Sequence, residues 1–142
     1  MAKILIIDDD GIVRDALSVF LTRDGNGVIT ASDGSGGVRA FKDHSPDLVV
    51  LDRDLPVMSG SGVLSSIRKI SATVPVIILS GFNAPEDMEA YIRAGAAAFL
   101  SKGDGLSPVL KEIDRLLDAG RKTDSAPVIK GKPSTAGAVR SG

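Results

Sequence analysis

The chain has 142 residues, enough for one ordinary domain with a short remainder, and it contains no cysteine. The lack of cysteine excludes a disulfide framework and a thiolate metal site, and it is compatible with a reducing cytoplasm. Of the 17 basic side chains, five lie in residues 121–142 beside a single acidic residue, so the preceding part is acidic. This charge argues against nucleic acid as the ligand of that part.

The first predicted element is an apolar run at residues 4–7, which ends in three consecutive aspartates. Four apolar residues are too few for a membrane span, and the residues before them do not form a signal peptide, so we expect neither. After the aspartates, apolar side chains recur at helical spacing from Val13 to Leu21. Asp10 or Gly11 is well placed to begin this helix.

Four more apolar runs follow, separated by segments with helical spacing. The second predicted helix, around Val38 and Phe41, carries Gly36 and Gly37 in its first turn. Each glycine costs about 1 kcal/mol relative to alanine, so we expect this helix to be short or frayed. In chain order, the later runs lie at 28–31, 48–51, 76–79 and 98–100, and the helices after them contain Val38, Val63, Met88 and Val109.

Short apolar runs bounded by turns and helices are typical of strands buried on both faces of a parallel sheet. Five strand and helix units with right-handed crossovers predict an α/β fold, a three-layer α/β/α sandwich. We assign residues 1–120 to this domain. Residues 121–142 are rich in small and polar residues, and we expect a disordered tail or a linker.

Polar groups stand at the carboxyl ends of four of these runs. Asp8 and Asp9 follow the first run, Asp52 follows the third, Ser80 follows the fourth, and Lys102 stands just after the fifth. In open parallel sheets the ligand crevice lies outside the carboxyl ends of the strands. We therefore expect these groups to meet in one place.

Three clustered carboxylates require a compensating positive charge. Two such charges at ~4 Å repel by roughly 4 kcal/mol at an effective dielectric constant of 20. An all-oxygen ligand set with room for water suits Mg²⁺ or Mn²⁺ better than Zn²⁺. Asp52, alone at its strand end, is a candidate nucleophile toward phosphorus, with Lys102 and Ser80 available to neutralise the phosphoryl oxygens. The simpler alternative, in which an aspartate only caps the first helix, is favoured for Asp10.

Four segments of the chain, in this order, resemble the motifs of the receiver domain of bacterial two-component response regulators, in particular a chemotaxis-regulator-like domain. The segments are 4–9, 46–60, 74–81 and 99–102. The resemblance covers essentially residues 2–119. It implies a flavodoxin-like fold with a five-stranded parallel sheet of order 2-1-3-4-5.

The resemblance also implies a role for each site residue. Asp52 would be the phosphoacceptor, Lys102 would contact the phosphoryl group, and Ser80 and Phe99 would form a switch pair of a hydroxyl and an aromatic ring. The proposed metal ligands are Asp8, Asp9 and Asp52, a backbone carbonyl at Arg53 or Asp54, and the side chain of Asp54 as a further candidate. Gly103 stands where the family commonly has proline, which leaves the conformation of the Lys102–Gly103 bond open.

The leading hypothesis is a cytoplasmic, phosphorylation-dependent signalling switch of a phosphorelay, not an enzyme beyond promoting its own phosphorylation and dephosphorylation. Its expected partners are a histidine kinase or histidine phosphotransfer protein and a downstream protein bound through the last two helices. We expect no direct contact with nucleic acid or membrane, and a monomer or weak dimer. Two alternatives stay open: a Mg²⁺-dependent phosphohydrolase, suggested by the spacing of Asp52 and Asp54, and an interaction module that works without phosphorylation.

Overall fold

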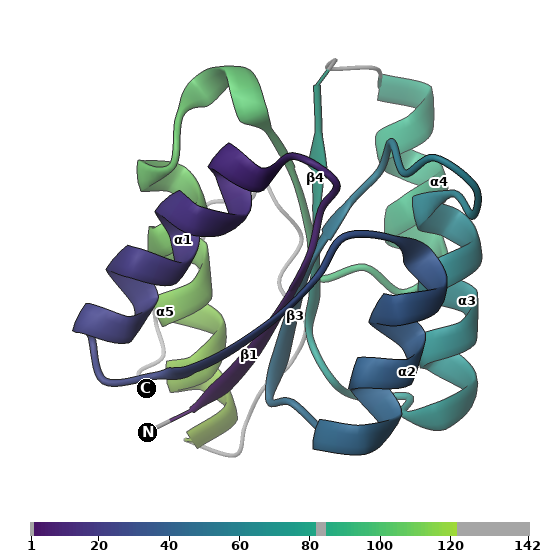
Figure 1. The fold of residues 1–142 in the computed structure, drawn as a ribbon. Coiled ribbons are helices and arrows are strands. Elements are labelled where there is room, and N and C mark those ends of the chain that lie inside the picture. Colours follow the sequence, from purple (N-terminus) through teal and green to yellow (C-terminus); the bar gives the residue numbers. More distant parts are fainter. Residues whose placement is uncertain (1, 82–84, 122–142) are drawn as a thin grey trace.

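The computed structural model describes residues 2–81 and 85–121 of the chain (Figure 1). Strands and helices alternate along these residues, as the apolar runs predict. In chain order the elements are β1 (Lys3–Ile7), α1 (Gly11–Arg23), β2 (Gly27–Ala31), α2 (Gly34–His44), β3 (Leu48–Asp52), α3 (Gly60–Ile70), β4 (Val76–Ser80), α4 (Pro85–Arg93), β5 (Ala98–Ser101), the 3₁₀ helix η1 (Lys102–Asp104) and α5 (Ser107–Arg121).

The five strands of the described residues form one parallel sheet of order β2-β1-β3-β4-β5. Helices α1 and α5 cover one face of this sheet, and α2, α3 and α4 cover the other (Figure 1). The predicted three-layer α/β/α sandwich and its flavodoxin-like strand order are therefore confirmed.

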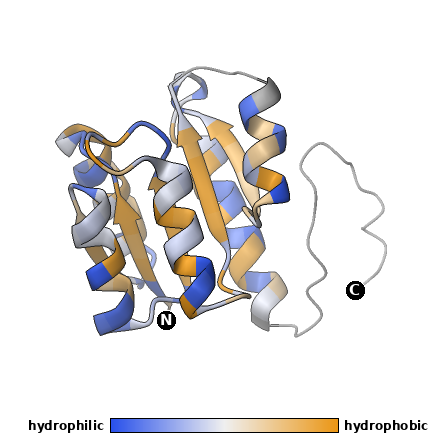
Figure 2. Cartoon of the chain, turned by 90° about the vertical axis from the view of Figure 1, so that its right-hand side faces the viewer, coloured by the Kyte–Doolittle hydropathy of each residue, from blue (hydrophilic) through white to orange (hydrophobic). Residues whose placement is uncertain are grey.

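Apolar side chains on both faces of the sheet make up the core. On β1, Leu5 and Ile7 belong to the core layer under α2, α3 and α4, whereas Ile4 and Ile6 belong to the layer under α1 and α5. All four are fully buried, and each such burial is worth about 1.5–3 kcal/mol. Figure 2 shows the strands as hydrophobic ribbons between helices that carry hydrophilic residues. The two core layers hold the sheet, and with it the strand ends, in a fixed arrangement.

Helix α2 packs closely on the sheet because the residue at the contact, Gly37, has no side chain. A Cβ atom at Gly37 would lie 2.5 Å from Cδ1 of Ile7 on β1. The expectation of a short or frayed helix was wrong, since α2 has 11 residues, the same length as α3. Close packing and a cap, in which Asp33 accepts the Gly36 N–H at 2.7 Å, outweigh the low helix propensity of glycine.

The C-terminal helix α5 runs to Arg121, and the expected tail beyond it lies outside the described residues. The assignment of residues 1–120 to one domain thus stays a prediction. Within residues 2–81 and 85–121, no helix has both the length and the apolar character needed to cross a membrane.

Candidate functional site

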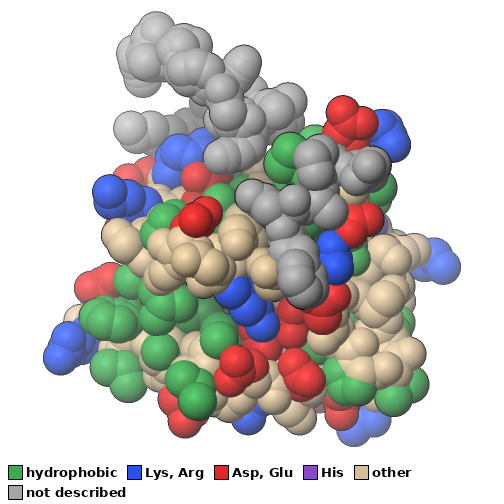
Figure 3. All heavy atoms as spheres, turned by 90° about the horizontal axis from the view of Figure 1, so that it is seen from above, with side chains coloured by type: hydrophobic (Ala, Val, Ile, Leu, Met, Phe, Trp, Pro, Cys, Tyr) green, Lys and Arg blue, Asp and Glu red, His purple; other side chains and the backbone are tan. Residues whose placement is uncertain are grey.

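Three carboxylates meet at the carboxyl ends of β1 and β3, as predicted from the parallel topology. Asp8, Asp9 and Asp52 each offer one oxygen atom, and these three atoms lie within 4.8 Å of one another. Asp8 and Asp52 are buried, whereas Asp9 is exposed at the mouth. The face of the molecule above the strand ends shows acidic and basic side chains gathered together (Figure 3).

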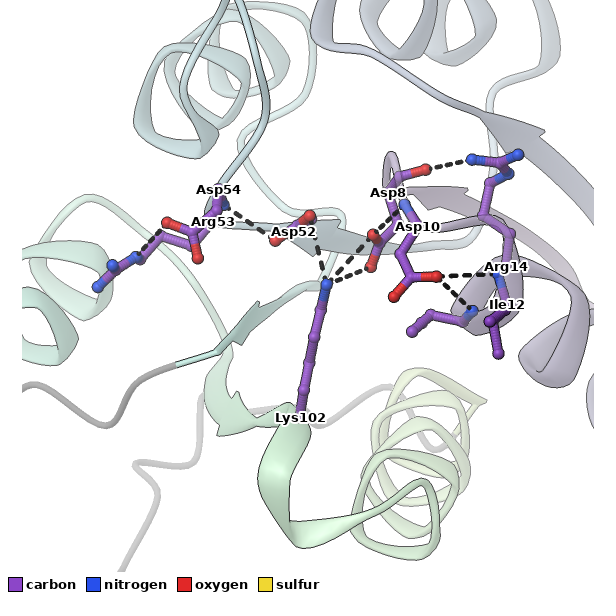
Figure 4. Close-up of polar contacts among 9 residues, drawn as sticks. Asp8, Asp10, Ile12, Arg14, Asp52, Arg53, Asp54 and Lys102 are labelled. Carbon is purple, nitrogen blue, oxygen red and sulfur yellow. Dashed lines mark hydrogen bonds and ion pairs between the residues drawn. The ribbon is translucent and has the colours of Figure 1, made fainter.

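The turn between β1 and α1 holds Asp8 through several hydrogen bonds. The Asp8 N–H donates to the carbonyl of Ala31 at 3.1 Å, and its Oδ1 accepts the N–H of Asp10 at 2.9 Å. Asp10 itself caps α1, as predicted, because its Oδ1 accepts the N–H of Ile12 at 2.9 Å. Arg14 donates from Nη1 to the backbone carbonyl of Asp8 at 2.7 Å (Figure 4).

Asp52 is held in a comparable way at the end of β3. Its Oδ1 accepts the N–H of Asp54 at 2.9 Å, and the next residue, Arg53, donates its N–H to the carbonyl of Leu79 on β4 at 2.8 Å. These bonds direct the side chain of Asp52 toward Asp8 and Lys102 (Figure 4).

Lys102 lies between the two buried carboxylates. Its Nζ is 3.1 Å from Oδ2 of Asp8 and 3.4 Å from Oδ2 of Asp52. Burial lowers the pKa of Lys102, but its hydrogen bond to Asp8 and the charges of Asp8 and Asp52 outweigh burial and raise the pKa above its ordinary value. The Lys102–Gly103 bond is trans, since residues 2–81 and 85–121 contain no cis peptide bond.

Burial and like charge act together on Asp52. Burial raises its pKa, and the charge of Asp8 raises it further, whereas the Asp54 N–H and Lys102 offset only part of this effect. Within the described part of the chain, Oδ2 of Asp8 is buried without a hydrogen bond and has only the ion pair with Lys102. One ammonium group does not balance three carboxylates, so the pocket retains an excess of negative charge.

This excess charge and the all-oxygen donor set fit a hard divalent cation such as Mg²⁺ or Mn²⁺. Asp8, Asp9 and Asp52 are the residues that would hold it. The Asp54 side chain does not join the three carboxylates: its Oδ1 pairs with Nε of Arg53 at 3.1 Å. Arg53 also forms an ion pair with Asp87 on α4.

The two expected switch residues lie in the interior of the fold. Ser80, at the end of β4, is completely buried. Phe99 on β5 is also buried, and its ring packs against Tyr91 of α4 with a centroid distance of 5.7 Å and an interplanar angle of 43°. The Phe99 ring therefore already lies inside the fold, away from solvent.

Sequence reasoning did not single out the side chains of three residues at this site. Arg14 donates to the backbone carbonyl of Asp8. Arg53 forms ion pairs with Asp54 and with Asp87 of α4. The available signal was a basic residue directly after Asp52 and another within the first turns of the helix that follows the aspartates.

Comparison with known proteins identifies the class. The family model for the response regulator receiver domain matches residues 4–114, which is most of the chain. The chain therefore belongs to the receiver domain family of two-component response regulators, and the resemblance seen in the sequence is confirmed.

Individual relatives agree with this assignment. The chain is 41% identical over 113 residues to the transcriptional regulatory protein KdpE of Mycobacterium tuberculosis, a match that covers 80% of this chain and 50% of KdpE. It is 33% identical over 117 residues to the chemotaxis protein CheY of Bacillus subtilis, covering 82% of this chain and 98% of CheY. The chain thus spans about half the length of KdpE, and nearly the whole of CheY aligns with it.

A solved structure supports the same fold. The response regulator receiver domain protein from Clostridium thermocellum superposes with a TM-score of 0.79 at 31% identity, covering 87% of this chain and 99% of that one.

Proposed function

We propose that this chain is a phosphorylation-dependent switch that accepts a phosphoryl group on Asp52 from a histidine kinase or a histidine phosphotransfer protein. The single observation that supports this most strongly is the meeting of Asp8, Asp9, Asp52 and Lys102 at the strand ends. The receiver family, whose members act in two-component signalling, supports the same reaction class.

The chemistry needs positioning and charge neutralisation more than covalent catalysis. An Asp52 oxygen forms a bond to phosphorus as the bond from phosphorus to the donor's imidazole nitrogen breaks, and the electron pair stays on that nitrogen. A Mg²⁺ or Mn²⁺ ion held by the three carboxylates would supply positive charge next to the transferring group.

Lys102 has a second task in this proposal. Its ammonium group already lies 3.4 Å from Oδ2 of Asp52, so it is placed to pair with a phosphoryl oxygen bonded there. In the unmodified chain the same ammonium group reduces the repulsion between Asp8 and Asp52. Ser80, buried at the end of the neighbouring strand, is the proposed hydroxyl donor to a remaining oxygen.

The proposed output is a changed affinity for a downstream protein that binds to α4 and α5. In this proposal the chain acts in the cytoplasm as a monomer or weak dimer. Moving a two-state equilibrium from 1:99 to 99:1 takes about 5.5 kcal/mol. The contact between Phe99 and Tyr91 is the proposed route by which a change at the strand ends reaches α4. Since the Phe99 ring is already buried, we expect a change in this packing, not a large inward rotation.

The phosphohydrolase alternative is less well supported. It requires Asp54 as a free general acid, yet the Asp54 carboxylate pairs with Arg53 outside the group of three carboxylates. The module without phosphorylation gains no support either, because the pocket keeps its carboxylates, lysine and buried hydroxyl.

The test is intact mass after incubation with acetyl phosphate and Mg²⁺. Wild-type protein should gain one phosphoryl group that is lost in hydroxylamine, and Asp52→Asn should gain none. Asp54→Asn is the matched control, since it removes a carboxylate two residues away, and it should still be labelled. An adduct on Asp52→Asn, or its loss in Asp54→Asn alone, would contradict the assignment of Asp52.

A further inference from the structure

Arg14 connects the first helix to the strand end that carries the acidic pair. It lies near the start of α1, and its half-buried side chain turns back toward β1. Its Nη1 donates to the backbone carbonyl of Asp8 at 2.7 Å (Figure 4). That carbonyl belongs to the peptide group that joins Asp8 to Asp9.

The geometry of a peptide group makes this contact informative. The group is planar, so fixing the direction of its carbonyl also fixes the plane between the Cα atoms of Asp8 and Asp9. Both acidic side chains leave the backbone from those two Cα atoms. A hydrogen bond to this one oxygen therefore restrains the placement of both carboxylates relative to each other.

The rest of the turn is built around the same peptide. The Asp10 N–H donates to Oδ1 of Asp8, and the Arg14 N–H donates to the carbonyl of Asp10 at 3.1 Å. At Gly11, an added Cβ atom would lie 3.4 Å from Nη2 of Arg14, so the guanidinium group passes close over the turn. Arg14 thus contacts the turn twice, through its backbone N–H at Asp10 and through its side chain at the Asp8 carbonyl.

We propose that Arg14 is a positioning residue that sets the relative placement of Asp8 and Asp9 and thereby increases the cation affinity of the pocket. This inference rests on the proposed function, in which these two acids hold Mg²⁺. The planar guanidinium group suits the task because it points a donor in a fixed direction from a partly buried stem. Outer residues that orient metal ligands commonly affect affinity in this way.

The sign of the effect separates positioning from simple electrostatics. Arg14 is a cation near a cation site, so if only its charge mattered, its removal would tighten Mg²⁺ binding. If Arg14 acts by holding the peptide between Asp8 and Asp9, its removal weakens Mg²⁺ binding despite the loss of a repelling charge.

The experiment measures Mg²⁺ affinity by isothermal titration calorimetry and, without Mg²⁺, the hydrogen exchange rate of the Asp10 amide by NMR. Arg14→Met should bind Mg²⁺ roughly tenfold more weakly than wild type and exchange the Asp10 amide faster. Arg14→Lys, which keeps a donor and the charge, should recover part of both losses. Arg39→Met removes the same charge from an exposed arginine on α2, which covers the opposite face of the sheet from α1, and this variant should stay within about twofold of wild type.

The inference is overturned if Arg14→Met binds Mg²⁺ as tightly as wild type or more tightly, whatever its Asp10 exchange rate. It is also overturned if Arg14→Lys behaves like Arg14→Met in both measurements. A wild-type chain that binds no Mg²⁺ would contradict the proposed function, whereas the Asp10 exchange rate would still decide whether Arg14 holds the turn.

Discussion

Replacing Asp52 by asparagine should stabilise the chain in the absence of metal while abolishing phosphorylation. Asparagine has the same shape, and its Oδ1 can still accept the N–H of Asp54. Its amide nitrogen takes the place of Oδ2, where it can donate to the buried carboxylate of Asp8 but no longer pairs with Lys102. The substitution therefore removes one charge and leaves the packing of the pocket unchanged.

The magnitude follows from the distances between the charges. Asp52 has two acidic neighbours with oxygens within 4.8 Å, and each such pair repels by about 3.5 kcal/mol at an effective dielectric constant of 20. The attraction to Lys102 at 3.4 Å returns about 5 kcal/mol on the same scale. The charge of Asp52 is thus unfavourable by about 2 kcal/mol, which corresponds to a melting temperature higher by roughly 5–10 °C in the variant.

The pH dependence has a definite sign. The pKa of Asp52 is raised above its ordinary value of 3.8 in the folded state, chiefly by burial, so the ionised carboxylate costs stability above that raised pKa. As the pH falls through the folded pKa toward 3.8, wild-type Asp52 takes up a proton and the cost disappears. The stability difference should therefore be largest at neutral pH and vanish in acid.

The assay is thermal or urea unfolding of both proteins in chelator, at neutral and acidic pH, and again with Mg²⁺. Because Mg²⁺ should bind the native pocket of wild type more strongly than that of Asp52→Asn, it should stabilise wild type more. The difference in stability between the two proteins should therefore become smaller with Mg²⁺. A variant less stable than wild type in chelator at neutral pH would refute the claim that the charge of Asp52 destabilises the metal-free chain. An equal gain from Mg²⁺ in both proteins would refute the role of Asp52 as a metal ligand.

Three further predictions concern other contacts. Lys102→Met should lower metal-free stability by about 2 kcal/mol, because it removes the cation that pairs with the buried Asp8. The loss is smaller than for a fully buried pair because Lys102 is one-quarter exposed, and Mg²⁺ binding in calorimetry should be retained. This loss should disappear as the pH rises through the raised Lys102 pKa, above its ordinary value of 10.5, because wild type then loses the same charge. A double-mutant cycle of Arg53→Ala and Asp87→Ala, read by urea unfolding, should give a salt-sensitive coupling of about 0.2–1 kcal/mol. Gly37→Ala should lower the unfolding free energy by about 2 kcal/mol, because its Cβ would overlap Ile7.

Each of these expectations has an outcome that contradicts it. Lys102→Met with strongly weakened Mg²⁺ binding would show that the lysine builds the metal site instead of balancing it. Additive effects in the double-mutant cycle would show that the ion pair to α4 contributes nothing. For the glycine, Gly120→Ala on α5 is the control, since among the described residues an added Cβ there meets nothing within 4 Å beyond its chain neighbours and the backbone of its own helix. Equal stability of the two alanine variants would exclude close packing as the cause.

Much of the fold follows from local patterns in the sequence. The run at residues 4–7 lacks polar interruptions because β1 is covered on both faces, and this signal needs no knowledge of the partner strands. Asp10 likewise predicts the start of α1 from the sequence, because an N-cap side chain bonds to backbone N–H groups only two or three residues away. Parallel topology then brings the carboxyl ends together, so Asp8, Asp52 and Lys102 could be grouped before any distance was known.

Tertiary structure alone decided the contacts that tune the site. No local pattern in the sequence pairs the side chains of Arg53 and Asp87, and only the packing of α4 beside the end of β3 brings them together across 34 positions. Glycine at position 37 looked like a weakness of its helix until Ile7 of β1 occupied the space. Local periodicity determines which segments become strands and helices, whereas side-chain direction and distance depend on how those segments pack. Packing is a property of the whole chain, so the contact of Arg14 with the Asp8 carbonyl becomes visible only when α1 lies beside the end of β1.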